Sequence, residues 1–165
     1  MKYLALPRGI NVGGNNIIKK DELKACFEKA GCSSVLTYIQ SGNILFCSDE
    51  TDREKIAKKA QTELYKKLNN KIQTVIYKEE EYQILSRQHD SWGKEPEKKH
   101  NALFLLTDMS PEEAQQKFPK INPQYEEISF AKGVVFWSGS KEHYTKTSYV
   151  KNLIKSPLYK QVTIR

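Results

Sequence analysis

The spacing of apolar side chains predicts alternating strands and helices along the first half of the chain. Lys2–Pro7 is an apolar run of strand length that ends at a proline followed by a glycine-rich segment. From Leu23 to Ala30, apolar residues recur at intervals of three and four, which is the period of an amphipathic helix over Lys20–Ala30. Gly31 stands where a C-terminal helix cap is expected.

A hairpin and a longer helix complete the pattern of this half. Val35–Gln40 and Asn43–Cys47 are strand-like and flank Ser41-Gly42, a tight-turn signal. Ser48 or Asp49 can cap a helix that runs to about Leu68, with apolar residues at every fourth position. Lys71–Tyr77 follows as a strand. The resulting order, βαββαβ, is that of a split ferredoxin-like unit.

The same order is predicted a second time after a connecting region. Lys78–Arg87 is expected to be a helix, and His89–His100 an exposed linker. The repeat then comprises a strand at Asn101–Thr107, a helix begun by Ser110-Pro111 and closed by Pro119, a hairpin of Gln124–Ala131 and Gly133–Ser138, a helix near Lys146–Lys155 and a strand at Gln161–Arg165.

These elements predict an α+β protein made of two consecutive ferredoxin-like βαββαβ units, or alpha-beta plaits, with antiparallel sheets. The expected division is a first unit at 1–78, a connecting helix and linker at 79–100, and a second unit at 101–165.

The segment PRGINVGGNN, Pro7–Asn16, is the best candidate for a binding site. It joins a strand to a helix, and glycines there can direct backbone N–H groups at a phosphate or carboxylate. The matching connection in the second unit, Thr107–Ser110, has no glycine, so this crossover geometry does not itself demand glycine. The candidate ligand-binding residues are Arg8, Gly9, Asn11, Gly13, Gly14, Asn15 and Asn43.

Other motifs give weaker evidence for a binding or catalytic function. The glycine segment lacks the Gly-Lys-Ser/Thr ending of a Walker A loop and is not GxGxxG. Ser138–Lys141 reads SxxK, but it follows a strand rather than opening a buried helix, which disfavours a serine nucleophile. His89-Asp90-Ser91 cannot form a triad from adjacent positions. No catalytic residue is assigned.

Composition limits the classes of partner and site. The formal net charge is +7, with 14 basic and 8 acidic side chains in residues 1–78, and 13 and 12 in residues 79–165. This excess is compatible with an anionic partner, although scattered lysines favour an ordinary soluble surface. Three cysteines without a CxxC pair, and three dispersed histidines, predict reduced thiols, a cytoplasmic location and no metal or other cofactor. Apolar runs are too short to span a bilayer.

Two motifs together resemble a bacterial family, domain of unknown function 1697. They are LALPRGINVGGNN and, about 30 residues later, TYIQSGNILF; weaker similarity extends to Thr163 and Arg165. The resemblance implies two ferredoxin-like subdomains and no established activity or cofactor. It also implies a further asparagine-containing segment and a final helix beyond the position of Arg165, which leaves either a truncation or a lost element.

Three functions remain open. The first is binding of a small anionic ligand at Arg8–Asn16, with Asn43 in support. The second is an acylphosphatase-like enzyme, by analogy of fold and loop chemistry only. The third is nucleic-acid binding through the basic helix at 55–67 and the basic tail at 141–165; this reading is not favoured. The oligomeric state is not predicted.

Overall fold

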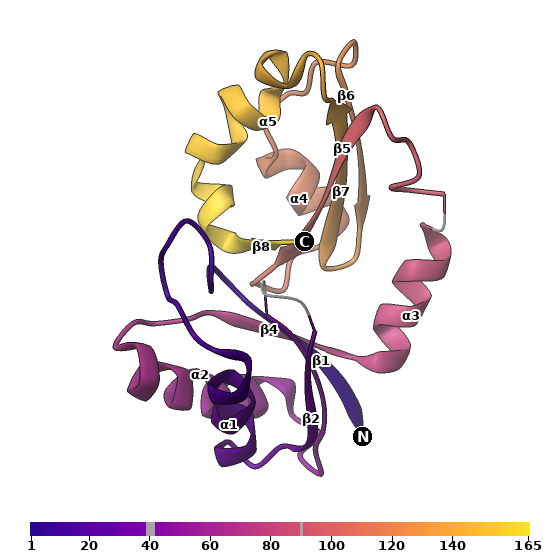
Figure 1. Cartoon of the computed structure of the whole chain (residues 1–165). Coiled ribbons are helices and arrows are strands. Elements are labelled where there is room, and N and C mark those ends of the chain that lie inside the picture. The colour runs from indigo at the N-terminus through magenta and orange to yellow at the C-terminus, as the bar shows by residue number, and fades with distance from the viewer. Residues whose placement is uncertain (39–41, 90) are drawn as a thin grey trace. The chain divides into compact units, whose positions relative to one another are not determined.

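The computed structural model describes residues 1–38, 42–89 and 91–165, and the chain forms two compact units, Met1–Arg87 and Gln88–Arg165 (Figure 1). Each unit contains a four-stranded antiparallel sheet, and the described residues include five α-helices, so the fold class is α+β. Ile39, Gln40, Ser41 and Asp90, which belong to the predicted hairpin and to the His89–Ser91 segment, lie outside the described residues.

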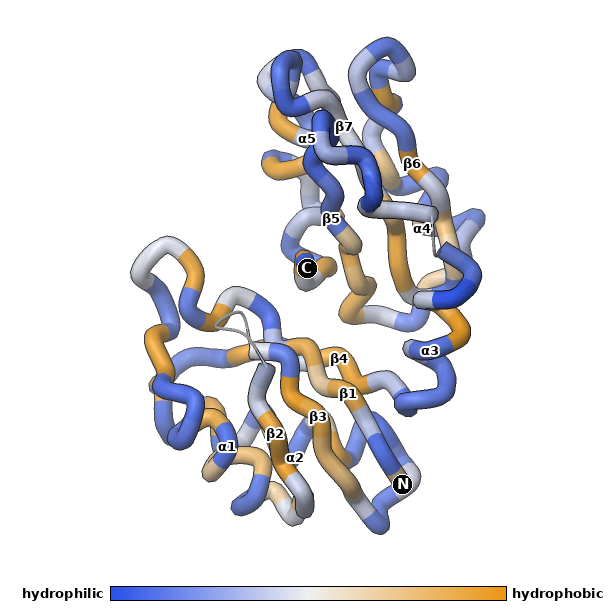
Figure 2. The backbone as a smooth tube through the Cα atoms, turned by 45° about the vertical axis from the view of Figure 1, so that its right-hand side comes forward, coloured by the Kyte–Doolittle hydropathy of each residue, from blue (hydrophilic) through white to orange (hydrophobic). Residues whose placement is uncertain are grey.

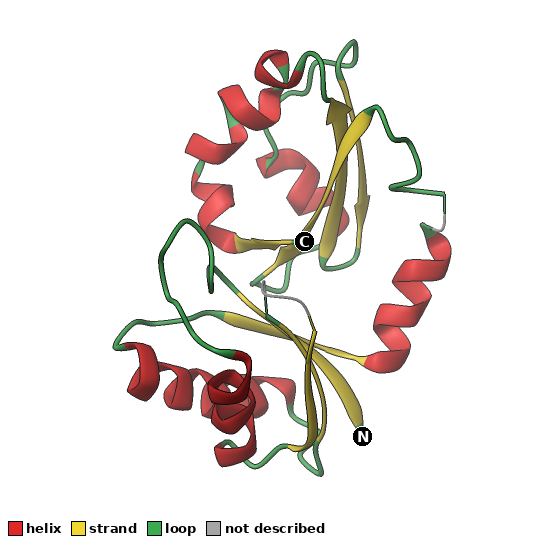
Figure 3. Cartoon of the chain, in the orientation of Figure 1, coloured by secondary structure: helices red, strands yellow, loops and turns green. Residues whose placement is uncertain are grey.

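The first unit contains the elements expected from the apolar pattern. Its strands have the order β2-β3-β1-β4, with all three neighbouring pairs antiparallel. Helices α1 and α2 lie on one face of this sheet (Figure 3). The bounds are β1 Lys2–Pro7, α1 Lys20–Lys29, β2 Ser33–Tyr38, β3 Asn43–Cys47, α2 Arg53–Leu68 and β4 Thr74–Lys78.

The core of the first unit lies between the sheet and these helices. Alternate residues of β1, such as Tyr3 and Ala5, face the helices because strand side chains alternate between the two faces. Phe27 from α1 and Leu64 from α2 are fully buried against them. Hydrophobic segments therefore follow β1, β3 and β4 along the backbone (Figure 2). Cys26 is also buried in this core.

Helix α3, Glu79–Gln88, follows β4 directly and buries none of its residues. It is tied to the first unit by ion pairs at its start: Glu79 with Lys2 at 3.7 Å, and Glu81 with Arg53 at 2.8 Å. The first compact unit accordingly extends to Arg87 and includes most of the helix that the sequence assigned to a connecting region.

The second unit repeats the element order and the sheet order. Its strands are arranged β6-β7-β5-β8, again with antiparallel neighbours. Helices α4 and α5 lie on one face, over a core that includes Leu103, Trp137 and Leu153. The bounds are β5 Lys98–Leu105, α4 Pro111–Lys117, β6 Glu126–Ala131, β7 Val134–Ser140, α5 Ser148–Lys151 and β8 Val162–Ile164.

Two predicted segments of the second unit differ from the structure. Strand β5 begins at Lys98, three residues before the expected start, because Lys98, Lys99 and His100 pair with the end of β7. The helix expected near Lys146–Lys155 is broken: 3₁₀ turns at Tyr144–Lys146 and Leu153–Lys155 flank the four residues of α5.

A buried carboxylate joins three parts of the second unit. Glu126 is 5% exposed and lies at the start of β6. Its Oε1 accepts hydrogen bonds from the backbone N–H groups of Asn122 (2.8 Å) and Ser148 (2.7 Å), and its Oε2 accepts from the Trp137 indole (2.8 Å). Burial raises the pKa of this carboxyl, but these hydrogen bonds outweigh burial and leave the pKa below its ordinary value.

Candidate functional site

The glycine-rich segment between β1 and α1 forms a small hairpin, which we call the glycine finger (residues 11–16). The Asn11 N–H donates to the Asn16 carbonyl at 3.2 Å, and the Asn15 N–H donates to the Val12 carbonyl at 3.0 Å. Gly13 and Gly14 occupy the two central turn positions with φ of 57° and 77°. Positive φ at both positions is the requirement of a type I′ turn, so the paired glycines have a direct structural cause.

Asparagine side chains brace the finger. The Asn11 side chain accepts from the Ile18 N–H at 2.8 Å and donates to the Ile18 carbonyl at 3.0 Å. The Asn16 side chain donates to the Gly9 carbonyl and accepts from the Asn70 side chain, both at 2.8 Å. The Asn15 amide donates to the Gly13 carbonyl at 3.3 Å. Asn11 and Asn15, which were expected to bind ligand, and also Asn16 thus serve at least partly to hold the loop in one conformation.

The base of the finger is anchored in the core of the first unit. Ile10 is 1% exposed and Ile18 is 4% exposed, and both belong to the buried cluster under the sheet. Gly42 lies against Ile10: a Cβ at position 42 would fall 2.1 Å from Ile10 Cδ1. The two sequence motifs therefore meet in space, and the glycine of the second is required by the isoleucine of the first.

Asn43 and Arg8 lie at the same end of the sheet. Asn43 is the first residue of β3 and pairs with Tyr38 of β2, while β1, which pairs antiparallel with β3, ends at Pro7. The Arg8 N–H donates to the Gln73 carbonyl at 2.8 Å, which continues the pairing of β1 and β4. Ser41, between the two strands of the predicted hairpin, lies outside the described residues.

The start of helix α1 differs from the expected anion cradle. The helix begins at Lys20, and its first-turn Glu22 accepts a hydrogen bond from the Lys19 N–H at 3.1 Å. The helix thus supplies its own carboxylate at its positive end. Gly13 and Gly14 belong to the turn of the finger, several residues before the helix, because the hairpin closes before the helix starts.

The finger and the residues on either side of it present cations, backbone donors and apolar groups to solvent. No acidic residue occurs among the first 20 residues, which include Arg8, Lys19 and Lys20. The backbone N–H groups of Gly13 and Gly14 have no hydrogen-bond partner among the described residues. Val12 is 59% exposed and Ile17 is 64% exposed. The segment is therefore positively charged, convex and partly apolar.

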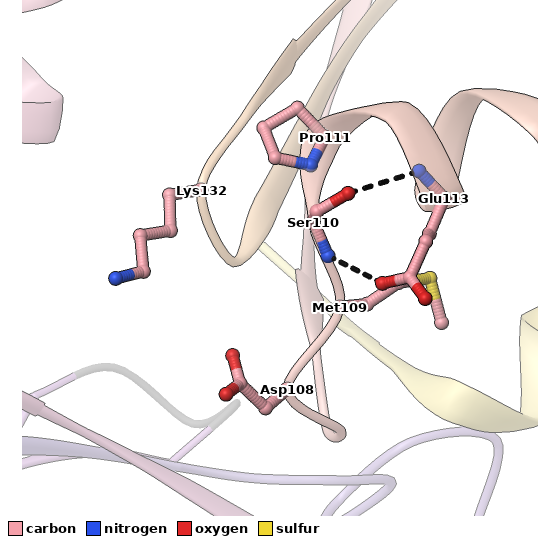
Figure 4. Close-up of a pocket in the computed structure, with 6 residues that line it drawn as sticks. All are labelled: Asp108, Met109, Ser110, Pro111, Glu113 and Lys132. Atoms are coloured by element: carbon pink, nitrogen blue, oxygen red, sulfur yellow. Dashed lines mark hydrogen bonds between the residues drawn. The ribbon is translucent and has the colours of Figure 1, made fainter.

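Two hollows on the described surface contain no residue of the finger. One is at the start of α4 and is lined by Asp108, Met109, Ser110, Pro111, Glu113 and Lys132 (Figure 4). There the Ser110 hydroxyl accepts from the Glu113 N–H, and the Glu113 carboxylate accepts from the Ser110 N–H, so these groups satisfy each other. The other hollow lies where the end of α1 meets α2, lined by Lys29, Ala30, Gly31, Lys59, Thr62 and Glu63.

Ser138 has a partner that the sequence did not suggest. Its hydroxyl lies 2.8 Å from Nδ1 of His100, and Nε2 of His100 lies 2.9 Å from the Glu95 carbonyl. Ser138 is 1% exposed, so the pair is closed to substrate in this conformation. The Lys141 ammonium bonds instead to the Pro96 carbonyl, so the SxxK spacing does not bring lysine to serine. Only the β5–β7 register, which places His100 opposite Ser138, could have revealed this contact.

The basic helix at 55–67, a candidate for nucleic-acid binding, has part of its positive charge neutralised. Lys55, Lys66 and Lys67 of α2 form ion pairs with Asp52, Glu63 and Glu22, respectively. Within the described residues no group of three or more His, Cys, Asp and Glu side chains could hold a metal ion. No helix of the described chain is both long and apolar enough to cross a bilayer.

Comparison with known proteins places the chain in a family. The model of the protein family of unknown function DUF1697 matches residues 1–136, which include both motifs that meet at Ile10 and Gly42. The chain belongs to this DUF1697 family. No curated protein matches the sequence.

The fold of this DUF1697 member is similar to that of a solved bacterial structure. The conserved bacterial protein SP0830 from Streptococcus pneumoniae is 29% identical, with a TM-score of 0.82. The match covers 99% of this chain and 91% of that chain. The similarity therefore includes both compact units rather than one of them.

Proposed function

We propose that the first unit binds an anionic, phosphate- or carboxylate-bearing ligand at the segment Arg8–Asn16. The observation that carries the proposal is a braced, exposed finger without acidic residues, whose Gly13 and Gly14 N–H groups have no partner among the described residues. Such N–H groups donate to anionic oxygens, and a nearby guanidinium adds a charge-assisted contact. Arg8 supplies the charge, and Asn11 and Asn43 position the loop.

We also propose a fold family for the two units and a cellular compartment for the protein. We assign both units to the ferredoxin-like plaits, supported by their shared βαββαβ order and by sheets in which the first and third strands are central. We assign the protein to the cytoplasm, because Cys26, Cys32 and Cys47 are all free thiols, as expected in a reducing compartment.

An NMR titration with pyrophosphate and with citrate tests the ligand class. The expected result is a saturable shift of the Gly13 and Gly14 amide resonances that weakens by about tenfold or more in Arg8→Ala, as expected for loss of one charge-assisted hydrogen bond. Arg87→Ala is the matched control, because Arg87 is exposed on α3 of the same unit. Equal weakening in both variants, or no shift at Gly13 and Gly14, contradicts the proposal.

A further inference from the structure

The shape of the glycine finger limits the kind of phosphate that it can recognise. Sites for small molecules are concave and bury most of the ligand surface. The finger is convex, with Val12–Asn15 exposed, and neither described hollow includes any of its residues. A partner that is itself grooved would enclose this projection better than a small ion would.

The hairpin form and the surface of the finger suit a groove of duplex DNA. Paired strands lie about 4.8 Å apart, and the major groove of B-form DNA, about 12 Å wide, admits a two-stranded β-ribbon. Lys19 and Lys20 flank the finger and are exposed, and residues 11–16 carry no acidic side chain, whereas Asp21 and Glu22 follow in the first turn of α1. Exposed Val12 and Ile17 offer apolar contacts of the type that proteins make with sugars and thymine methyl groups.

We infer that the anionic partner of the finger is the phosphate backbone of double-stranded DNA, with the Gly13-Gly14 turn inserted in a groove. This inference rests on the proposed function, since it names the source of the phosphate. Arg8, Lys19 and Lys20 contact phosphates on either side of the groove, and the Gly13 and Gly14 N–H groups approach one backbone closely because they carry no side chains. The deep, narrow major groove of A-form RNA does not accept the same projection.

Fluorescence anisotropy with a labelled 20-base-pair DNA duplex, measured over a range of salt concentrations, tests the inference. Three phosphate contacts predict a log–log salt slope of about −2.7. Lys19→Gln/Lys20→Gln is expected to reduce the slope to about −0.9 and the affinity by about tenfold or more at low salt. The matched control is Lys58→Gln/Lys59→Gln, which removes the same charge from exposed positions on α2 and leaves the slope within about 0.5 of that of the parent chain.

Two further measurements distinguish docking of the finger in a DNA groove from nonspecific electrostatic attraction to nucleic acid. Val12→Ser/Ile17→Ser is expected to lower the affinity several-fold without changing the salt slope, because it removes apolar contacts and no charge. Double-stranded RNA of equal length is expected to bind more weakly than DNA.

The possible negative results distinguish failure of the DNA inference from failure of the proposed function. Equal losses in the finger and α2 variants, or equal binding of RNA and DNA, overturn the inference. Pyrophosphate-dependent shifts of Gly13 and Gly14 without DNA binding overturn the inference and leave the proposed function standing, with a free phosphate compound as the ligand. Absence of both signals overturns both.

Discussion

At the scale of single residues, the buried Glu126 carboxylate of the second unit should be sensitive to substitution. It accepts hydrogen bonds from N–H donors of three different segments: the backbone at Asn122, the backbone at Ser148 and the Trp137 indole. Glu126→Gln would place an amide N–H₂ against at least one of these donors, which leaves a buried N–H without an acceptor. We expect a loss of about 2–3 kcal/mol in the free energy of unfolding at pH 7, measured by chemical denaturation.

The stability difference between the parent chain and Glu126→Gln should depend on pH in a predictable direction. Because the folded pKa of Glu126 lies below its ordinary value, the carboxylate stabilises the folded chain above the unfolded pKa, and this stabilisation is lost as the pH falls through the folded pKa. The difference between parent and Glu126→Gln should therefore shrink in acid. Glu127→Gln is the control, because Glu127 is exposed and pairs only at the surface with Lys98. A constant difference from pH 7 to pH 3 would contradict the argument.

The residues of the candidate site show what sequence could and could not predict. The run Gly13-Gly14 indicated a segment of permissive backbone, but its cause, a type I′ turn, depends on the pairing of Val12 with Asn15. The contact of Gly42 with Ile10 joins positions 32 residues apart and has no local signal. Asn11 was predicted as a ligand-binding residue, and its second role, bracing the loop together with Asn16, depends on contacts with Ile18 and Gly9 that the sequence pattern does not reveal.

At the scale of elements, helix starts were predictable where one candidate cap was available. Ser110 was predicted to cap α4, and this is confirmed by its reciprocal hydrogen bonds with Glu113. For α2 the sequence offered Ser48 or Asp49, and this prediction is wrong: the cap is Asp52, whose carboxylate accepts from the N–H groups of Glu54 and Lys55. Several residues in this segment can form a cap, so the start of α2 is set instead by the packing of Ile56 and Ala60 into the core.

The α2 cap leads to a test with a control in the same segment. Asp52→Ala removes both cap hydrogen bonds and a negative charge near the positive end of a 16-residue helix. We expect thermal and chemical denaturation to show a loss of about 1 kcal/mol. Asp49→Ala, at the exposed one of the two cap positions that the sequence offered, should change stability by less than about 0.5 kcal/mol. A larger effect at Asp49 would mean that it, rather than Asp52, caps the helix.

At the scale of the whole molecule, the repeated order of elements was the most predictable feature. Helices and strands of both units appear in the expected sequence, because binary apolar patterns report element type well. Strand ends were less predictable: β4 begins at Thr74 rather than Lys71, and β5 at Lys98 rather than Asn101. These shifts follow from cross-strand partners, such as Gly139 opposite Lys99, which lie far away in sequence.

The two cores share no residue among those described, which predicts that the units can be separated. We expect the fragments Met1–Arg87 and Gln88–Arg165 each to fold, with dispersed amide spectra and cooperative unfolding by circular dichroism. Each should be only marginally stable, by a few kcal/mol, because chains of about 80 residues bury limited apolar surface. Both tryptophans belong to the second fragment, and Trp137 lies in its core, so tryptophan fluorescence reports on the folding of this fragment alone.

The first fragment provides the sharper comparison, because it contains the complete finger and its braces. Asn16, Asn70 and Ile10 all lie within Met1–Arg87, so the amide resonances of Gly13 and Gly14 should keep their positions when the second unit is removed. Any anion response of these amides should be retained as well. A random-coil spectrum for this fragment would show that the core of the first unit does not suffice to fold it, and the finger would then depend on the full chain.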